Sequence, residues 1–209
     1  MFSNLSGSNI IFLLLAIIIS LVIHETMHGV VAFWLGDDTA MEAGRLSLNP
    51  LKHIDPITTI ILPAILIITV GVPFLAAKPV PFNPNKVKFG EFGAALVGIA
   101  GPLTNLILAV ITAVIFRLFG ANWQGNLLDA VVIFAQINIA MFVFNMIPFP
   151  PLDGSRLLYA FAPEGVQEVM ARIEAAGFTT TLVFIFIVFY VASGPIFNIE
   201  NGLLQLLFG

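Results

Sequence analysis

Residues 9–35 read NIIFLLLAIIISLVIHETMHGVVAFWL, an apolar stretch whose ionisable side chains are confined to one short cluster. A helix that crosses the hydrocarbon core of a bilayer needs about 20 consecutive apolar residues, so this stretch is long enough to span a membrane. It differs from a cleaved signal peptide, because its leader carries no positive charge and because the cluster HETMH interrupts its apolar part. The stretch therefore predicts a transmembrane helix that is retained in the mature protein.

The composition of the whole chain also predicts a membrane protein. Of the 209 residues, 59% are hydrophobic and only 10% are charged, whereas a soluble domain carries about 25% charged residues. Acidic residues outnumber basic ones, 12 to 8, and no basic stripe is present, so we expect the lipid bilayer and not nucleic acid as a partner. The chain has no cysteine, which excludes disulfides and thiol catalysis, so any metal ion must be held by His, Asp or Glu.

Four further apolar runs follow along the chain, at 57–77, 92–119, 127–148 and 178–194. The second and third of these are long enough to span, and the last is close to the minimum length. The run at 57–77 contains prolines and a glycine that interrupt a regular helix, so we expect a re-entrant or broken element there. The polar segment 36–56 alternates in RLSLN and predicts a small β-hairpin. The expected fold class is an all-α polytopic membrane protein with about four spanning helices.

The basic residues indicate how these helices are oriented. Basic residues close to membrane ends prefer the cytoplasmic side, and seven of the eight lie in the polar stretches between apolar runs. All of these stretches can be cytoplasmic only if residues 57–77 do not cross. We therefore expect a multi-pass protein of the cell membrane with its N-terminus outside. Since no repeat or long linker divides the chain, we expect one domain over 1–209, with a core at 9–160 and a C-terminal helix at 178–194.

The cluster inside the first apolar run has the spacing of a metal site. His24 and His28 are four residues apart and share one face of a helix, so both imidazoles can bind one metal ion. Glu25 can reach a metal-bound water as a general base, as in the H-E-x-x-H signature of zinc proteases. Alternatively, the three side chains are polar groups satisfied by neighbours within a helix bundle. The metal site is favoured, because three ionisable groups in an apolar helix are costly without such a partner.

A catalytic zinc ion normally has three protein ligands and a water, so a third ligand is needed. Asp153 is the candidate, because it lies in a proline-broken segment at the end of the run 127–148. By itself, the sequence PPLDG around it is also typical of an ordinary turn at a helix end. His53 is a competing ligand, but it lies in a polar loop, and we interpret it as a solvated histidine.

Several motifs together resemble those of the site-2 protease family of intramembrane zinc metalloproteases. HETMH matches the first motif of the family, NMIPFPPLDG resembles the second, and GIAGPLTNLILA resembles an element of the intervening core helix; these are residues 24–28, 145–154 and 98–109. GRLSLNP at 44–50 and AKPVPFNP at 77–84 are typical of the small bacterial members. These similarities cover most of residues 20–160.

The resemblance implies a function and a set of roles. It implies one zinc ion per chain, held by His24, His28 and Asp153, with Glu25 as the catalytic residue. It also implies that Asn145 helps to hold the substrate strand or the oxyanion. The implied reaction is cleavage of transmembrane substrate proteins within the bilayer, as in regulated intramembrane proteolysis. The chain has no room for the PDZ or CBS module that some members carry.

Asn105, in GPLTN, is the least determined of the candidate residues. Its side chain could contact the substrate or the active site, or it could hold membrane helices together as polar residues do. The sequence favours neither of these two roles. The small residues Ala94, Gly98 and Gly101 on the same helix predict close helix packing rather than a cofactor site.

The alternative function is a metal-transporting or metal-binding membrane protein that uses the same histidines and Asp153. Transporters often contain internal repeats, and this chain has none. Transport would also leave Glu25 without a role, so the protease is favoured.

Overall fold

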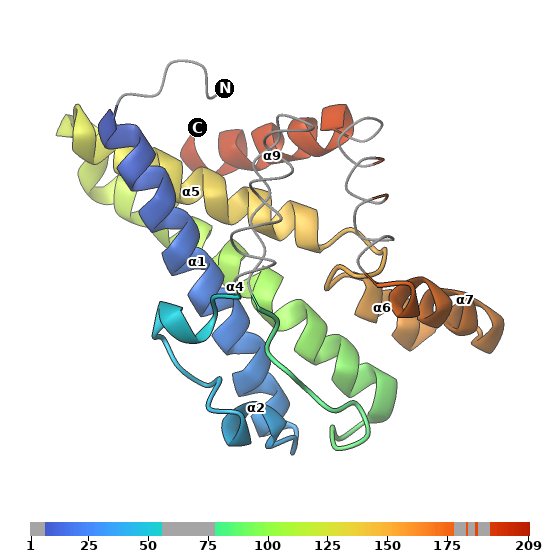
Figure 1. The fold of residues 1–209 in the computed structure, drawn as a ribbon. Coiled ribbons are helices and arrows are strands. Elements are labelled where there is room, and N and C mark those ends of the chain that lie inside the picture. The colour runs from blue at the N-terminus through green and yellow to red at the C-terminus, as the bar shows by residue number, and fades with distance from the viewer. Residues whose placement is uncertain (1–6, 56–77, 178–182, 184–186, 188–192) are drawn as a thin grey trace.

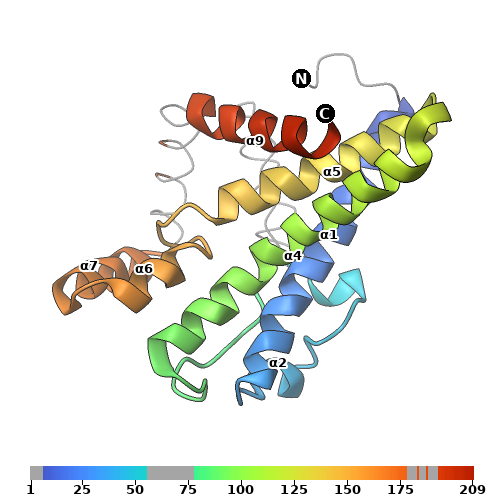
Figure 2. The same ribbon diagram turned by 180° about the vertical axis from the view of Figure 1, so that it is seen from behind.

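A computed structural model describes residues 7–55, 78–177, 183, 187 and 193–209. Three long helices dominate it: α1 (Gly7–Trp34), α4 (Gly90–Phe119) and α5 (Asn126–Asn145). At 1.5 Å per residue they are about 42, 45 and 30 Å long, and each is long and apolar enough to cross a membrane. Consecutive long helices run in opposite directions and lie against one another (Figures 1 and 2). The all-helical membrane architecture is thus confirmed, with three of the expected spans described.

Two of the predicted elements lie wholly or mostly outside the residues that the structure describes. The broken run at 57–77 lies outside the described residues, and so does most of the predicted helix at 178–194. The number of spanning helices and the path of residues 57–77 therefore remain predictions.

The segment that follows α1 does not form the predicted hairpin. It contains α2 (Thr39–Glu42) and a 3-10 turn, η1 (Pro50–Lys52), and none of the described residues 36–55 is in a strand. Asn49 caps η1, since its side-chain oxygen accepts a hydrogen bond from the Leu51 N–H at 3.0 Å. The carbonyl oxygen of Ser47, which a hairpin would use in its ladder, accepts instead from the side chains of Thr26 and His53. Side-chain contacts have therefore replaced strand pairing.

After α5 the chain forms two short helices, α6 (Ser155–Phe161) and α7 (Glu164–Ala175), beside the first turns of α4 (Figure 1). The Phe161 ring packs edge-on against that of Phe92, with centroids 5.3 Å apart. Because Gly98 of α4 lies close to the carbonyl oxygen of Asp153, the loop between α5 and α6 is held against α4.

A 3-10 turn, η3 (Gly120–Asn122), joins α4 to α5.

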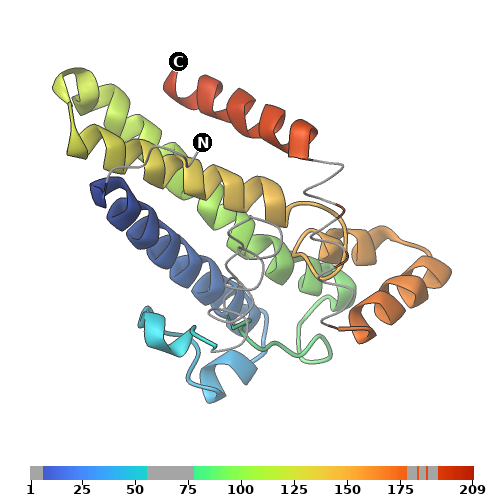
Figure 3. The same ribbon diagram turned by 45° about the horizontal axis from the view of Figure 1, so that its top comes forward.

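The C-terminal segment forms a helix that the sequence analysis missed. Helix α9 spans Ser193–Phe208 and lies alongside α5 (Figure 3), and it extends beyond the last apolar run that the sequence indicated. Its apolar residues at helical spacing pack on the buried cluster of α4 and α5: Ile196, Leu203, Leu204 and Leu207. Pro195 falls in the first turn, where a missing N–H removes no helical hydrogen bond.

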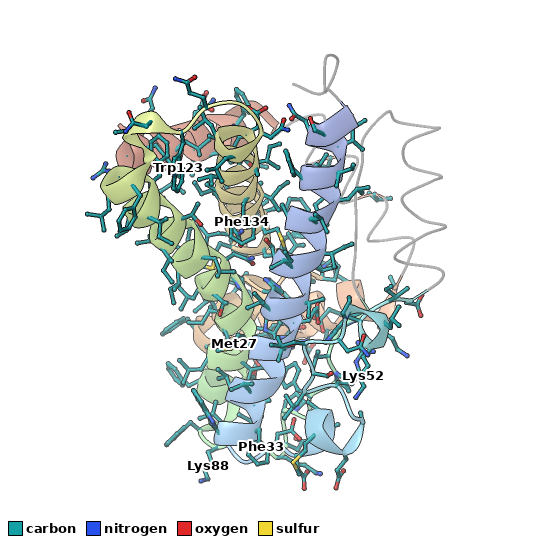
Figure 4. All side chains as sticks on the ribbon, turned by 90° about the vertical axis from the view of Figure 1, so that its left-hand side faces the viewer. Met27, Phe33, Lys52, Lys88, Trp123 and Phe134 are labelled. Atoms are coloured by element: carbon teal, nitrogen blue, oxygen red, sulfur yellow. The ribbon has the colours of Figure 1, made fainter. Side chains whose placement is uncertain are left out.

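The two ends of the bundle are marked by different side chains. Lys88 lies near Phe33 at the end where α1 finishes, Lys52 lies to one side at a level between Met27 and Phe33, and Trp123 lies at the opposite end (Figure 4). Along the first half of α1, large apolar side chains such as Ile11 and Leu15 are exposed. The outer surface of α1 is therefore suited to lipid, and the end bearing Lys88 is suited to an aqueous boundary.

Candidate metal centre

Three ligand-type side chains converge where α1 passes the loop between α5 and α6. His24 and His28 extend from one face of α1, and their Nε2 atoms are 3.1 Å apart. Asp153 Oδ2 lies 3.0 Å from His24 Nε2 and 3.4 Å from His28 Nε2. Among the described residues, these three form the group of His, Asp and Glu side chains that could hold a metal ion. The fold thereby brings together His24 and Asp153, which are 129 positions apart in the sequence.

The dimensions of this group fit zinc. Ligands placed tetrahedrally at the usual Zn–N and Zn–O distances of about 2.0–2.1 Å lie about 3.3 Å from one another, close to the three separations observed. Two imidazoles and one carboxylate also form a typical catalytic donor set, which leaves a fourth position open. The His24 side chain is 4% exposed, whereas that of Asp153 is 24% exposed, so the group is accessible from the Asp153 side.

The far nitrogen of each imidazole has a partner that determines its protonation. His28 Nδ1 lies 2.7 Å from the carbonyl oxygen of Val97, and His24 Nδ1 lies 2.6 Å from Asn105 Oδ1. Both oxygens accept hydrogen bonds, so each Nδ1 carries the proton and each Nε2 presents a lone pair to the centre. Asn105 therefore contacts the site from behind His24, fully buried, which corresponds to one of the two roles left open by the sequence.

Two glycines of α4 make room for the centre. A Cβ atom at Gly101 would lie 2.4 Å from His28 Nε2 and 2.6 Å from His24 Nε2. A Cβ atom at Gly98 would lie 2.7 Å from Arg156 Cβ and 3.0 Å from the Asp153 carbonyl oxygen. The sequence predicted close helix packing rather than a cofactor site, but Gly101 lies against the two candidate ligand rings and Gly98 lies against Arg156 and the backbone of Asp153.

The loop that carries Asp153 is tied to the end of α5. The Gly154 N–H donates to the Asn145 carbonyl oxygen at 2.7 Å, and the Asn145 side-chain Nδ2 donates to the Met141 carbonyl oxygen at 2.9 Å. Leu152 anchors the loop from the other side, buried among Phe144, Ile147, Phe149 and Ile196. Asn145 is thus half-buried next to the loop, and its amide nitrogen supports the last turn of α5.

The Glu25 side chain is held by the extended segment 78–84. The Val80 N–H donates to Glu25 Oε2 at 2.9 Å. Arg45, 7% exposed, holds the same segment, because its guanidinium donates to the carbonyl oxygens of Lys78 and Lys52. The carboxylate of Glu25 is therefore oriented by the backbone of a loop and not by a neighbouring helix.

Asp37 attaches the other end of segment 78–84. Its fully buried carboxylate accepts hydrogen bonds from the Asn83 N–H at 2.6 Å and from the Thr39 hydroxyl at 2.5 Å. Burial opposes ionisation of Asp37, but these hydrogen bonds and the charge of Lys86 outweigh it and lower its pKa. Arg156 adds a contact from α6, since its guanidinium lies over the Phe82 ring, 5.6 Å from the centroid.

His53 does not behave as the sequence analysis expected. It is 1% exposed, and its Nε2 donates to the Ser47 carbonyl oxygen at 2.7 Å, so the interpretation as a solvated loop histidine is wrong. The carbonyl oxygen of His53 also accepts from the Lys78 N–H. His53 is not part of the metal-ligand group, and it joins the loop after α1 to segment 78–84 instead.

The sequence analysis singled out neither Arg45 nor Asn138 as a functional residue. Arg45 was counted only as a basic residue, although a charged side chain within the apolar alternation RLSLN was a signal for burial. Asn138 lies within the third long helix and is fully buried. Its signal was a polar residue in an apolar run, which needs a partner in lipid.

Comparisons with known proteins identify the class to which this site belongs. The pattern of peptidase family M50 matches residues 118–189. "Putative zinc metalloprotease YwhC" of Bacillus subtilis is 40% identical over 179 residues, covering 82% of this chain and 78% of its own. "Putative zinc metalloprotease Rip2" of Mycolicibacterium smegmatis is 28% identical over 166 residues, which are 79% of this chain and 63% of Rip2. No solved structure matches the chain.

These relatives define a class of zinc metalloprotease, and the three long helices of this chain are apolar enough to cross a membrane. The chain belongs to peptidase family M50, the site-2 protease family. The expected resemblance is thus confirmed, and the metal-transporting alternative is not favoured.

Proposed function

We propose that this chain is an intramembrane endopeptidase in which His24, His28 and Asp153 hold one zinc ion. The observation that carries the proposal is the convergence of these three donor groups within 4.8 Å of one another, in a bundle whose long helices are able to span a membrane. We take residues 1–209 as one membrane-embedded protease domain. Its substrates would be transmembrane proteins, cut within the bilayer as a step in regulated proteolysis.

The chemistry is divided between the metal and the chain. When bound, zinc supplies a Lewis acid that lowers the pKa of a water molecule and polarises the scissile carbonyl group. Glu25 accepts the proton of the attacking water on its carboxylate and delivers it to the leaving amine. The hydrogen bond from the Val80 N–H to Oε2 holds that carboxylate in one orientation while leaving Oε1 for the proton.

The depth of the centre supports hydrolysis near the cytoplasmic side. His28 is six residues from Trp34, where α1 ends, which is about 9 Å along a helix. That end of the bundle carries Lys88 (Figure 4), and basic residues prefer the cytoplasm. Water therefore has a short path to the partly exposed Asp153.

A substrate helix must unwind before it can be cut, because its carbonyl groups are held in its own hydrogen bonds. Residues 78–84 are extended and lie against Glu25, so an unwound substrate could add alongside them as a strand. Asn145, beside the Asp153 loop, would hold the substrate strand or the oxyanion. We assign Asn105 to the support of His24, since its amide is fully buried.

The function is tested by replacing Glu25 with Gln. An endopeptidase should keep one zinc ion per chain and lose cleavage of a reconstituted transmembrane substrate by at least about 100-fold, as expected when a general base is removed. Asp153→Ala should lose zinc and activity together. Cleavage by Glu25→Gln at the normal rate would exclude the proposed base, and zinc transport into vesicles by the same variant would instead support a transporter.

A further inference from the structure

Two asparagines meet in the interior of the bundle, behind the metal centre. Asn105 of α4 and Asn138 of α5 are both 0% exposed, on helices that are otherwise strongly apolar. Buried amides need partners for both of their polar atoms. The orientation of each amide therefore determines whether the neighbouring side chain must donate or accept a hydrogen bond.

The hydrogen bonds of these residues form one continuous chain. Asn138 Nδ2 donates to the carbonyl oxygen of Phe134 at 2.8 Å. Asn105 Nδ2 donates to Asn138 Oδ1 at 2.8 Å, and it also approaches Met141 Sδ, a weak acceptor, at 3.8 Å. Asn105 Oδ1 faces His24 Nδ1 at 2.6 Å. The chain thus leads from the backbone of α5 through two amides to an imidazole of the centre.

The direction of this chain is determined at its α5 end. A backbone carbonyl can only accept, so the amide of Asn138 must turn its NH₂ group to Phe134 and its oxygen to Asn105. That oxygen can also only accept, so Asn105 must turn its NH₂ group to Asn138 and its own oxygen to His24. An oxygen facing Nδ1 requires a proton on Nδ1. Reversing any one amide would place two acceptors in contact without a proton between them.

We propose that Asn138 is a positioning residue for the metal centre. Through Asn105, it imposes the Nδ1–H tautomer of His24 and so keeps the Nε2 lone pair directed at the metal. This inference rests on the proposed function only in taking His24 as a ligand. Outer partners of metal-bound histidines commonly change metal affinity by about 10- to 100-fold.

His28 provides a built-in comparison. Its Nδ1 donates directly to the Val97 carbonyl oxygen, a fixed acceptor that needs no amide to orient it. Disruption of Asn138 should therefore affect His24 and leave the tautomer of His28 unchanged. If the asparagines served only to hold α4 against α5, neither tautomer would respond.

The experiment uses ¹⁵N-histidine NMR of the full chain in nanodiscs, after removal of zinc. The chain has only three histidines, so each ring can be assigned with single substitutions. In the unmodified protein, His24 should show a protonated Nδ1. In Asn138→Leu, which lacks the acceptor, His24 should populate the Nε2–H form, and its zinc dissociation constant should rise about 10-fold or more.

Two further variants separate this role from simple packing. Thr112→Val removes a buried hydroxyl of α4 that donates to the Leu108 carbonyl oxygen of its own helix, and it should leave His24 and zinc affinity unchanged. Asn105→Asp supplies a carboxylate that accepts from His24 Nδ1–H without help from Asn138. If Asn138 acts through Asn105, adding Asn138→Leu to the Asn105→Asp protein should therefore have little further effect on the tautomer of His24. This comparison remains informative if the Asn138→Leu single variant folds poorly.

The proposal is overturned if His24 keeps its Nδ1 proton in Asn138→Leu and zinc affinity is unchanged. It is also overturned if the effect of Asn138→Leu is equally large in the Asn105→Asp background. A failure of the proposed function is seen separately, because His24→Ala would then retain zinc as tightly as the unmodified protein.

Discussion

His24 and Glu25 are neighbours on α1, yet two different kinds of structure hold their side chains. His24 faces the helix bundle, where a buried amide of α4 accepts from its ring. Glu25 faces the loops, where its carboxylate accepts from the backbone of residue 80. The two histidine ligands are thus supported by helices that cannot move without opening the core, whereas the base is supported by a loop segment that side chains hold in place. We infer that changes on the helix side alter metal binding and that changes on the loop side alter catalysis with the metal retained.

The largest effect is expected from Gly101→Ala, on the helix side. The new methyl group would lie within 2.4–2.7 Å of the ring atoms of His24 and His28, and neither α4 nor α1 can retreat without opening the core. Zinc content, measured by metal analysis of the purified protein, should fall from one per chain to near zero. Activity should be lost with it, since a fixed ligand arrangement is required.

The matched control for this variant is Gly165→Ala on α7, where no atom lies within 4 Å of the added Cβ. It should keep full zinc content and activity. Full zinc content in Gly101→Ala would instead mean that α1 and α4 do not hold the two histidines rigidly.

An intermediate effect is expected from Arg45→Lys, on the loop side. Lysine keeps the charge but lacks the planar fork that reaches two carbonyl oxygens at once. Segment 78–84 should then shift, and kcat should fall about 10- to 100-fold, because small displacements of a catalytic group are costly. Zinc content should remain one per chain, which metal analysis of the same sample would check.

Lys88→Arg is the control, because it exchanges the same two residue types in the opposite direction at an exposed position. It should leave kcat and zinc content unchanged. A parallel loss of zinc and kcat in Arg45→Lys would show that the two sides of α1 form a single unit, contrary to the comparison.

The smallest effect is expected at Asp37, which attaches the far end of the same segment. Its pKa is lowered in the folded protein, so its contribution to stability is fully present above the unfolded pKa of about 3.9 and is lost as pH falls further. The melting temperature should therefore decrease more steeply below about pH 4 in the unmodified protein than in Asp37→Asn. At pH 7 the same substitution should cost about 1.5–3 kcal/mol, the range for hydrogen bonds to a charged group.

Thermal unfolding at several pH values measures both quantities, with Asp38→Asn as the control. Asp38 is adjacent but exposed, and its partner Lys86 is exposed as well, so little stability should depend on it. Identical pH profiles for Asp37→Asn and the unmodified protein would contradict the role given to Asp37.

The errors of the sequence analysis lie where one segment takes its structure from another. The alternation in RLSLN predicted a hairpin, but Arg45, Thr26 and His53 direct their side chains to the carbonyl groups of these loops. Helix α9 was missed, because the apolar stripe of Ser193–Phe208 is interrupted by Asn and Glu residues. In both cases the deciding contacts are made with residues distant in sequence.

Local periodicity and the cost of burying charge were sufficient to predict the membrane helices and the pairing of His24 with His28. Four residues make little more than one turn of a helix, so their alignment needs no tertiary information. The sequence named Asp153 as the candidate third ligand, and the structure brings it to the two histidines. The tertiary structure alone decided that Gly101 faces the two rings and that Asn138 lies behind Asn105. Those relations depend on how α1, α4 and α5 are rotated about their axes, which is determined by packing between helices and not by the pattern of any single one.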